Sequence, residues 1–238
     1  MADRTRVAVI TGGSKGLGRA LARALGGNGW SLVLDARGAE ALEAVGRELR
    51  AQGTTTVVTV PGDVADEQHR WQLVEAAEQL GGLHLLVNNA SVLGPSPQPR
   101  LADYPLDVLG RVYEVNVVAP LALVQAALPM LRASAGRVLD ISSDAAVEPY
   151  EGWGGYGSAK AALDHLTAVL AAEEPGVRFY AVDPGDMRTQ MHQDAFPDED
   201  ISDRPPPEDS VPGLLRLVDG DLPSGRYQAR ALVPEVTA

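Results

Sequence analysis

The chain has 238 residues, of which 45% are hydrophobic, and its formal net charge is -12. This length allows one sizeable core, so we expect a single domain over residues 1–238. The acidic balance argues against nucleic acid and anionic membranes as partners. The lack of cysteine excludes disulfides, thiolate metal sites and a cysteine nucleophile, and we predict no metal site. With neither a signal-peptide core at the start nor a membrane-length apolar run, we expect a cytoplasmic protein.

A glycine-rich turn follows the first apolar segment of the chain. Residues 6–11 are predicted to form a buried strand, and an Ala/Leu-rich helix follows the turn. Glycines in such a turn let the backbone approach a pyrophosphate, which the helix N-terminus attracts. This order of strand, turn and helix favours dinucleotide binding over a plain turn. The turn consists of Thr11, Gly12, Gly13, Ser14, Lys15, Gly16, Leu17 and Gly18.

The rest of the chain alternates between short apolar runs and helical stretches. Strands are predicted at 31–34, 55–60, 84–87, 136–142, 177–182 and 226–233, and helices at 39–52, 66–80, 104–132 and 208–218, with a further helix around Tyr156. This alternation predicts an α/β fold, a Rossmann-type doubly wound sheet of about seven parallel strands with helices on both faces.

A tyrosine and a lysine four residues apart indicate proton chemistry. Tyr156 and Lys160 would share one face of a helix, and the ammonium would lower the pKa of the phenol from its ordinary value near ~10. Ser143 directly follows the strand predicted at 136–142, where it could hold a carbonyl or alcohol oxygen while Tyr156 gives or takes the proton. The alternative is an ordinary helix pair on a half-exposed face.

Several polar residues follow predicted strands, at the edge where ligands collect in an open parallel sheet. Asp63 could hold an adenine amino group or could belong to a turn. Asn88 and Asn89 could brace neighbouring loops or contact a cofactor. Asn116 stands four residues before Pro120, and because proline has no N–H, the Asn116 carbonyl would be free to hold a water, unless packing fills a kink there.

The segment 186–209 shows no strand pattern and contains three consecutive prolines. Loops of this length are often functional, and we predict a substrate-binding lid that closes over substrate and cofactor. Trp153, Met191 and Phe196 suggest a partly apolar pocket. His192 is interpreted as a loop residue and not as a base, because the tyrosine and lysine already supply the proton chemistry.

In order and spacing, these motifs resemble the short-chain dehydrogenase/reductase family over roughly residues 6 to 190. The resemblance implies reversible hydride transfer between a nicotinamide dinucleotide and a small carbonyl or alcohol substrate. It implies a catalytic tetrad of Asn116, Ser143, Tyr156 and Lys160, in which a water on the Asn116 carbonyl leads to Lys160. The residues that it implies at the cofactor are Gly12, Ser14, Lys15, Gly16, Leu17, Gly18, Arg37, Asp63, Val64, Asn89, Tyr156, Lys160, Pro184, Gly185 and Thr189.

The chain departs from the family pattern in two places. Ser91 stands where the family usually has glycine, and the C-terminal segment lacks the family's usual Val-Asp-Gly-Gly ending, which bears on tetramer formation. We expect a homodimer or a homotetramer. An epimerase, dehydratase or lyase on the same scaffold stays an alternative, as does a catalytically silent nucleotide-sensing protein, because fold does not fix function.

The residues after the second predicted strand give opposite indications of whether the cofactor is NAD or NADP. An acidic residue about twenty positions after the glycine motif normally binds the ribose of NAD, and Asp35 lies near that distance. Counting along the family's NAD-preferring members instead places the ribose-reading residue at Ala36, and the alternation of a strand turns Asp35 to the other face. Lys15 and Arg37 could attract a 2'-phosphate, because arginine binds phosphate through two donors. We therefore expect NADP(H).

Overall fold

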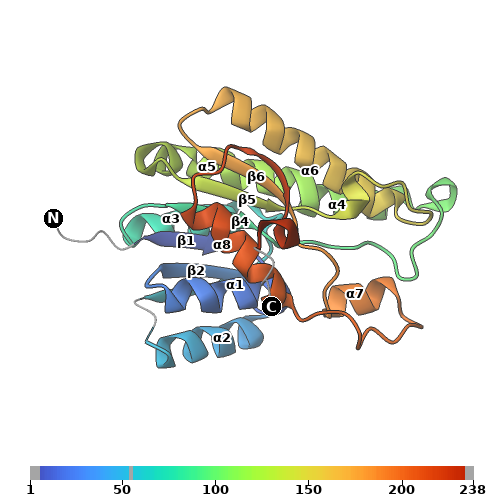
Figure 1. Cartoon of the computed structure of the whole chain (residues 1–238), viewed down its shortest axis with the longest axis horizontal. Helices are drawn as coiled ribbons and strands as arrows, with labels where there is room; N and C mark the ends of the chain where they lie inside the picture. The colour runs from blue at the N-terminus through green and yellow to red at the C-terminus, as the bar shows by residue number, and fades with distance from the viewer. Residues whose placement is uncertain (1–5, 54–55, 234–238) are drawn as a thin grey trace.

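A computed structural model describes residues 6–53 and 56–233 of the chain. These residues form a sheet of seven parallel strands in the order β3-β2-β1-β4-β5-β6-β7, which confirms the predicted doubly wound fold (Figure 1). The order reverses between β1 and β4, the place where such sheets bind ligands. The strands are β1 (Val7–Ile10), β2 (Ser31–Ala36), β3 (Val57–Pro61), β4 (Leu85–Asn88), β5 (Arg137–Ile141), β6 (Arg178–Asp183) and β7 (Gly225–Gln228).

Helices cover both faces of the sheet, and Figure 1 shows α1 and α2 along one side and α5 and α6 along the other. Buried residues of α1, α2 and α8 pack on one face, and those of α3 and α5 pack on the other. The helices are α1 (Gly16–Gly27), α2 (Ala39–Ala51), α3 (Glu67–Gln79), α4 (Leu106–Tyr113), α5 (Ala119–Ser134), α6 (Gly154–Glu173), α7 (Gln190–Ala195) and α8 (Val211–Asp219).

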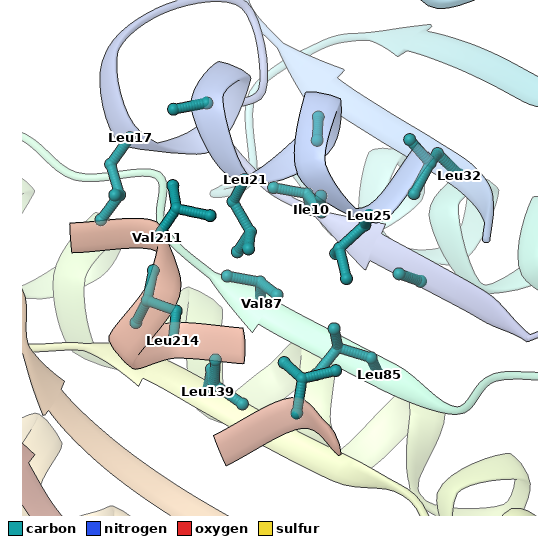
Figure 2. Packing of buried hydrophobic residues seen from close by; sticks show 14 of the residues in the cluster. Ile10, Leu17, Leu21, Leu25, Leu32, Leu85, Val87, Leu139, Val211 and Leu214 are labelled. Atoms are coloured by element: carbon teal, nitrogen blue, oxygen red, sulfur yellow. The ribbon is translucent and has the colours of Figure 1, made fainter. Parts of the chain in front are cut away.

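Burial on both faces explains why the strands read as continuous apolar runs and not as alternating ones. Side chains of neighbouring strand positions enter opposite cores, as Val9 and Ile10 of β1 do. Figure 2 shows the core that α1 and α8 form with the strands, with Ile10, Leu17, Leu21, Leu25, Leu32, Leu85, Val87, Leu139, Val211 and Leu214 labelled.

The structure corrects several predicted boundaries. The helix predicted over 104–132 is divided into α4, a π-helical turn at Glu114–Val118 and α5. Pro120 stands in the first turn of α5, and the wider π turn before it accommodates the missing N–H donor. The strand predicted at 55–60 is β3, and residue 55 itself lies outside the described residues.

The C-terminal part also differs from the prediction. The segment 186–209 contains the short helix α7, and Figure 1 shows α7 set apart from the main layers. The last strand, predicted over 226–233, ends at Gln228 and continues as a 3₁₀ turn, Ala229–Leu232. This turn packs against α8, where a side chain on Gly213 would collide with the Ala229 carbonyl.

One helical stretch, Leu106–Ser134, is long and apolar enough to cross a membrane, with a mean hydropathy of 1.5. Half of the most apolar 18-residue part of this stretch is buried inside the protein. Leu123 and Leu131 belong to the core on the face of the sheet that α3 and α5 cover. Length and composition alone are weak grounds for a membrane span, because a core helix has the same properties. We therefore interpret this stretch as a core helix.

Candidate active site

A cavity of about 450 Å³ lies at the carboxyl ends of the strands, between the glycine-rich turn, α6 and the segment 186–209. Ligands collect at this edge in doubly wound sheets. The predicted site residues that line it are Gly12, Lys15, Gly16, Leu17, Asn89, Ser143, Tyr156, Lys160, Pro184, Gly185 and Thr189. Six other predicted residues do not line the cavity: Ser14, Gly18, Arg37, Asp63, Val64 and Asn116.

The first turns of α6 place Tyr156 and Lys160 on one buried face of the helix. Lys160 Nζ lies 5.5 Å from the centroid of the Tyr156 ring and donates a hydrogen bond of 2.7 Å to the carbonyl of Ile141, the last residue of β5. Gly157 lets the helix approach this edge, because a Cβ there would lie 2.6 Å from the Ala145 carbonyl oxygen. The structure thus brings the predicted pair together as expected.

The pKa of Tyr156 differs from the prediction. We expected Lys160 to lower it, but burial raises the pKa of Tyr156 well above its ordinary value. A hydrogen bond with Ser91 opposes this rise, while the carboxylates of Asp144 and Asp183 add to it. Burial also lowers the pKa of Lys160 to about 8. Desolvation therefore dominates at both groups and favours the neutral phenol of Tyr156.

Ser143 follows β5 and caps a 3₁₀ turn at Asp144–Ala146. Its hydroxyl accepts a hydrogen bond of 3.2 Å from the backbone N–H of Ala145 and donates one of 2.8 Å to Asp144 Oδ1. The same carboxylate accepts a hydrogen bond from the hydroxyl of Tyr150. Because the Ser143 proton points to Asp144, the hydroxyl must rotate before it can donate to a ligand in the cavity.

Asn116 lies in the π-helical turn and is buried. Its amide pairs with the backbone of Val92: Oδ1 accepts from the Val92 N–H and Nδ2 donates to the Val92 carbonyl, both at 2.9 Å. Oδ1 also accepts a hydrogen bond of 3.1 Å from the Ser91 hydroxyl. The side chain therefore braces the loop after β4, a function that the sequence did not indicate. The water on the Asn116 carbonyl stays a prediction.

Asn89 braces the glycine-rich turn and also lines the cavity. Its Nδ2 donates to the carbonyl oxygens of Thr11, at 2.7 Å, and Gly12, at 3.2 Å. Gly12 and Gly16 have φ angles of 66° and 54°, which favour glycine. A Cβ on Gly18 would lie 2.4 Å from the Gly12 carbonyl oxygen, so only glycine allows this close turn.

Asp35 is buried and faces α3, the side of β2 opposite to Ala36. Its Oδ1 lies 2.6 Å from Nε2 of His69 on α3, and its Oδ2 accepts a hydrogen bond of 3.4 Å from the backbone N–H of Gly12. Asp35 thus supports the glycine-rich turn through the Gly12 N–H. Its side chain lies on the α3 face of the sheet, opposite to Ala36, as the alternation of the strand predicts. The sequence did not indicate His69 as the partner of Asp35, because only the fold brings the two residues together.

Asp63 is held by a turn and by an ion pair. Its Oδ1 accepts a hydrogen bond of 3.0 Å from the Ala65 N–H, and its Oδ2 pairs with Arg111 of α4. Val64 is buried beside Val115 and Ala119. The turn interpretation of Asp63 is therefore realised in the structure, while its contact with adenine stays a prediction.

Aromatic and sulfur-containing side chains form one wall of the cavity. Trp153 packs edge-on against Tyr156, with ring centroids 5.9 Å apart, and lies 5.7 Å from Phe196. Trp153 and Met191 line the cavity, as predicted for a partly apolar pocket, whereas Phe196, which was predicted there too, contacts Trp153 without lining the cavity. His192 contacts Phe196, and among the described residues its Nε2 has no hydrogen-bond partner although it is buried. Segment 186–209 supplies most of this wall, and its closure as a lid stays a prediction.

Comparisons with known proteins agree on one family. A family model described as short chain dehydrogenase matches residues 6–200. Sepiapterin reductase of Mus musculus is 37% identical over 199 residues, which cover 79% of this chain and 76% of that protein. A solved short chain dehydrogenase from Shigella flexneri complexed with NADP has 27% identity and a TM-score of 0.87, covering 97% of this chain and 100% of that one. An alcohol dehydrogenase from the archaeon Thermococcus sibiricus complexed with 5-hydroxy-NADP has 29% identity and a TM-score of 0.84, covering 94% and 95%.

Proposed function

The chain belongs to the short-chain dehydrogenase/reductase family of oxidoreductases, and on that premise we propose that it transfers a hydride between NADP(H) and a small carbonyl compound, forming the alcohol. The observation that carries this proposal is the cavity in which Ser143, Tyr156 and Lys160 meet the glycine-rich turn. The relatives include a reductase and an alcohol dehydrogenase by name, which favours the same chemistry. We further propose a cytoplasmic homodimer or homotetramer.

The glycine-rich turn fits a pyrophosphate. Gly12 and Gly16 line the cavity and carry no side chain that would stand between the backbone and a ligand. Within the described part of the chain, the side chain of Lys15, the N-cap of α1, gives no hydrogen bond to the helix. The first N–H groups of α1 are therefore free of a side-chain cap and suited to an anion. The residues of the glycine-rich turn and the start of α1 thus fit the pyrophosphate of a dinucleotide.

The residues of the cavity divide the proton chemistry among them. A nicotinamide dinucleotide held at this turn would supply or accept the hydride. Ser143 rotates its hydroxyl away from Asp144 and donates to the carbonyl oxygen of the substrate. Tyr156 then gives its phenolic proton to that oxygen as the carbonyl becomes an alkoxide. The positive charge of Lys160, held against the Tyr156 ring, stabilises the phenolate that this step leaves.

Cofactor choice follows from the end of β2. Asp35 faces α3, Ala36 offers no carboxylate to repel a 2'-phosphate, and Lys15 and Arg37 are exposed. Two solved structures of similar fold contain NADP or a hydroxylated NADP. We expect kcat/KM for NADPH to exceed that for NADH by at least about tenfold, because a charge-assisted hydrogen bond contributes roughly 1.5–3 kcal/mol.

Arg37→Ala is expected to remove most of this preference, and the measurement is kcat/KM with each cofactor. Arg47→Ala is the control, because Arg47 is an exposed cation in the middle of α2, whereas Arg37 directly follows β2. A wild-type preference for NADH would contradict the assignment and would mean that Asp35 reaches the ribose.

Asp35→Ala tests the same assignment independently of Arg37. The substitution removes the oxygen that accepts from the Gly12 N–H, so it is expected to weaken NADPH and NADH by a similar factor of about five to ten, the effect of roughly one hydrogen bond. Dissociation constants for both cofactors measure this effect, with Glu67→Gln on the surface of α3 as the control. If the variant loses affinity for NADH alone, Asp35 contacts the ribose.

The activity itself is tested by following NADPH oxidation with a panel of carbonyl compounds. The wall of Trp153 and Met191 favours flat, largely apolar ketones and aldehydes over small charged ones. We expect turnover to rise with the apolar area of the carbonyl compound. Failure to oxidise NADPH with every member of a broad panel would count against the proposal.

A further inference from the structure

The carboxylate of Asp144 accepts the one proton that the Ser143 side chain can donate. The two residues follow β5, both line the cavity, and Ser143 Oγ lies 2.8 Å from Asp144 Oδ1. A serine hydroxyl has one proton and two lone pairs, whereas an ionised carboxylate only accepts hydrogen bonds. The Ser143 proton therefore lies between these two oxygens, and a ligand oxygen that only accepts must compete with Asp144 for it.

Two further hydrogen bonds hold the Asp144 carboxylate in this position. Its Oδ1 accepts a hydrogen bond of 2.8 Å from the Ala145 N–H, and its Oδ2 accepts one of 3.0 Å from the Tyr150 hydroxyl. Both donors stay with Asp144 when the Ser143 hydroxyl turns away, so the rotation leaves the turn after β5 intact. It costs one hydrogen bond to a charged oxygen, which is roughly twice as strong as a bond between neutral groups.

While Ser143 donates to Asp144, its oxygen keeps a lone pair for a ligand. One lone pair accepts the Ala145 N–H at 3.2 Å, which leaves the other. An alcohol can donate its hydroxyl proton to this lone pair without disturbing Asp144. A ketone oxygen has no proton, so it can bond with Ser143 only after the Ser143 hydroxyl has left Asp144. The oxygen of either ligand can still accept from the neutral phenol of Tyr156.

We infer that Asp144 is a positioning residue, which fixes the direction of the Ser143 hydroxyl and thereby favours binding of the alcohol over binding of the ketone. This inference rests on the proposed interconversion of a carbonyl compound and an alcohol. It involves no proton transfer, because Ser143 keeps its proton in both complexes. The overall equilibrium of the reaction is unchanged, and Asp144 changes only how tightly each ligand binds.

Asp144→Ala removes the competing acceptor. The affinity for the ketone is therefore expected to rise by about tenfold relative to the affinity for the alcohol, the equivalent of one charge-assisted hydrogen bond. The probes are acetophenone with NADP⁺ bound and 1-phenylethanol with NADPH bound, two complexes in which no hydride can be transferred. Ligand-observed NMR gives both dissociation constants and hence their ratio. Turnover is not the readout, because the charge of Asp144 also raises the pKa of Tyr156.

Asp144→Asn is the second variant, for the case that alanine perturbs the turn. Its neutral amide holds the Ser143 proton about half as strongly as the carboxylate does, so the ratio is expected to move in the same direction by at least about threefold. Asp186→Asn is the matched control. It neutralises a carboxylate that lines the same cavity and, within the described part of the chain, makes no hydrogen bond with Ser143. The ratio is expected to stay unchanged in this control.

The same substitution in a Ser143→Ala background separates an effect on the hydroxyl from an effect on the shape or charge of the cavity. Without the Ser143 hydroxyl, Asp144→Ala is expected to change the ratio by less than about twofold. An unchanged ratio in the Asp144 variants, a shift toward the alcohol, or an equal shift in the Ser143→Ala background would overturn the inference. Absence of turnover in the wild type would instead refute the proposed function, and the dissociation constants, which need no turnover, would still test Asp144.

Discussion

Tyr156→Phe is expected to lower kcat/KM for carbonyl reduction by at least about 10²-fold, the contribution typical of a general acid. The substitution deletes one hydroxyl and keeps the ring that packs against Trp153, so the fold and the cofactor affinity should stay unchanged. Steady-state kinetics and the dissociation constant for NADPH measure the two effects separately.

Tyr227→Phe is the matched control for this prediction. It also deletes one phenolic hydroxyl, which in the native protein bonds to the Pro223 carbonyl at the surface. Full activity is expected in this control. Near-full activity in Tyr156→Phe would show that Tyr156 is not the acid.

Lys160→Met is expected to abolish most activity and yet to stabilise the fold at neutral pH. Burial lowers the pKa of Lys160 from 10.5 to about 8, which is about 3 kcal/mol of cost for the charged form in the folded state. Methionine removes this cost but leaves the buried Ile141 carbonyl without the Lys160 donor, which costs about 1–3 kcal/mol. Asp140 also loses a nearby positive charge. We expect a net gain of about 1 kcal/mol in the free energy of unfolding at pH 7.

Because the pKa of Lys160 is lower in the folded than in the unfolded protein, the stability gained in Lys160→Met depends on pH. Below about pH 8, Lys160 is protonated in both the folded and the unfolded chain, and the cost is present in full. Between about pH 8 and 10.5 the folded protein releases the proton first, so the cost shrinks as the pH rises. Denaturant unfolding at pH 7 and near pH 10 should therefore show that the difference in the free energy of unfolding between Lys160→Met and the wild type becomes smaller at the higher pH.

Lys15→Met, at an exposed lysine, is the control, and its free energy of unfolding should change little. A gap that stays constant with pH, or a variant less stable at pH 7, would contradict the account.

The alternation of apolar runs and helical stretches was enough to predict the fold. Parallel strands have their carboxyl ends at one edge of the sheet. Because Ser143 follows a strand and Tyr156 lies in the helix after it, the sequence was enough to predict that both line one cavity at this edge. The π-helical turn around Asn116 was not predictable, because Pro120 indicates only a missing donor and not how the backbone absorbs it.

What the sequence could not supply was the surroundings of each ionisable group. The spacing of Tyr156 and Lys160 indicates a nearby charge, but the pKa of the phenol depends on burial, which only the packed structure gives. Asp35 and His69 lie 34 residues apart and meet through the β2-β3-α3 crossover. Ser91 was visible as a departure from the family pattern, but its contact with Asn116 depends on how the loop after β4 folds back.

The central claim is that a hydride passes between the nicotinamide and a carbonyl carbon under the control of Tyr156. It is tested most directly with NADPH that carries deuterium at the transferring position of the nicotinamide ring and an aromatic ketone as substrate. The account predicts one deuterium on the carbinol carbon of the product, one oxidised cofactor for each alcohol formed, and a rate of product formation at least about 10²-fold lower in Tyr156→Phe. A product without deuterium, or product formed with no net oxidation of cofactor, would contradict it and would favour an epimerase, dehydratase or lyase on the same scaffold.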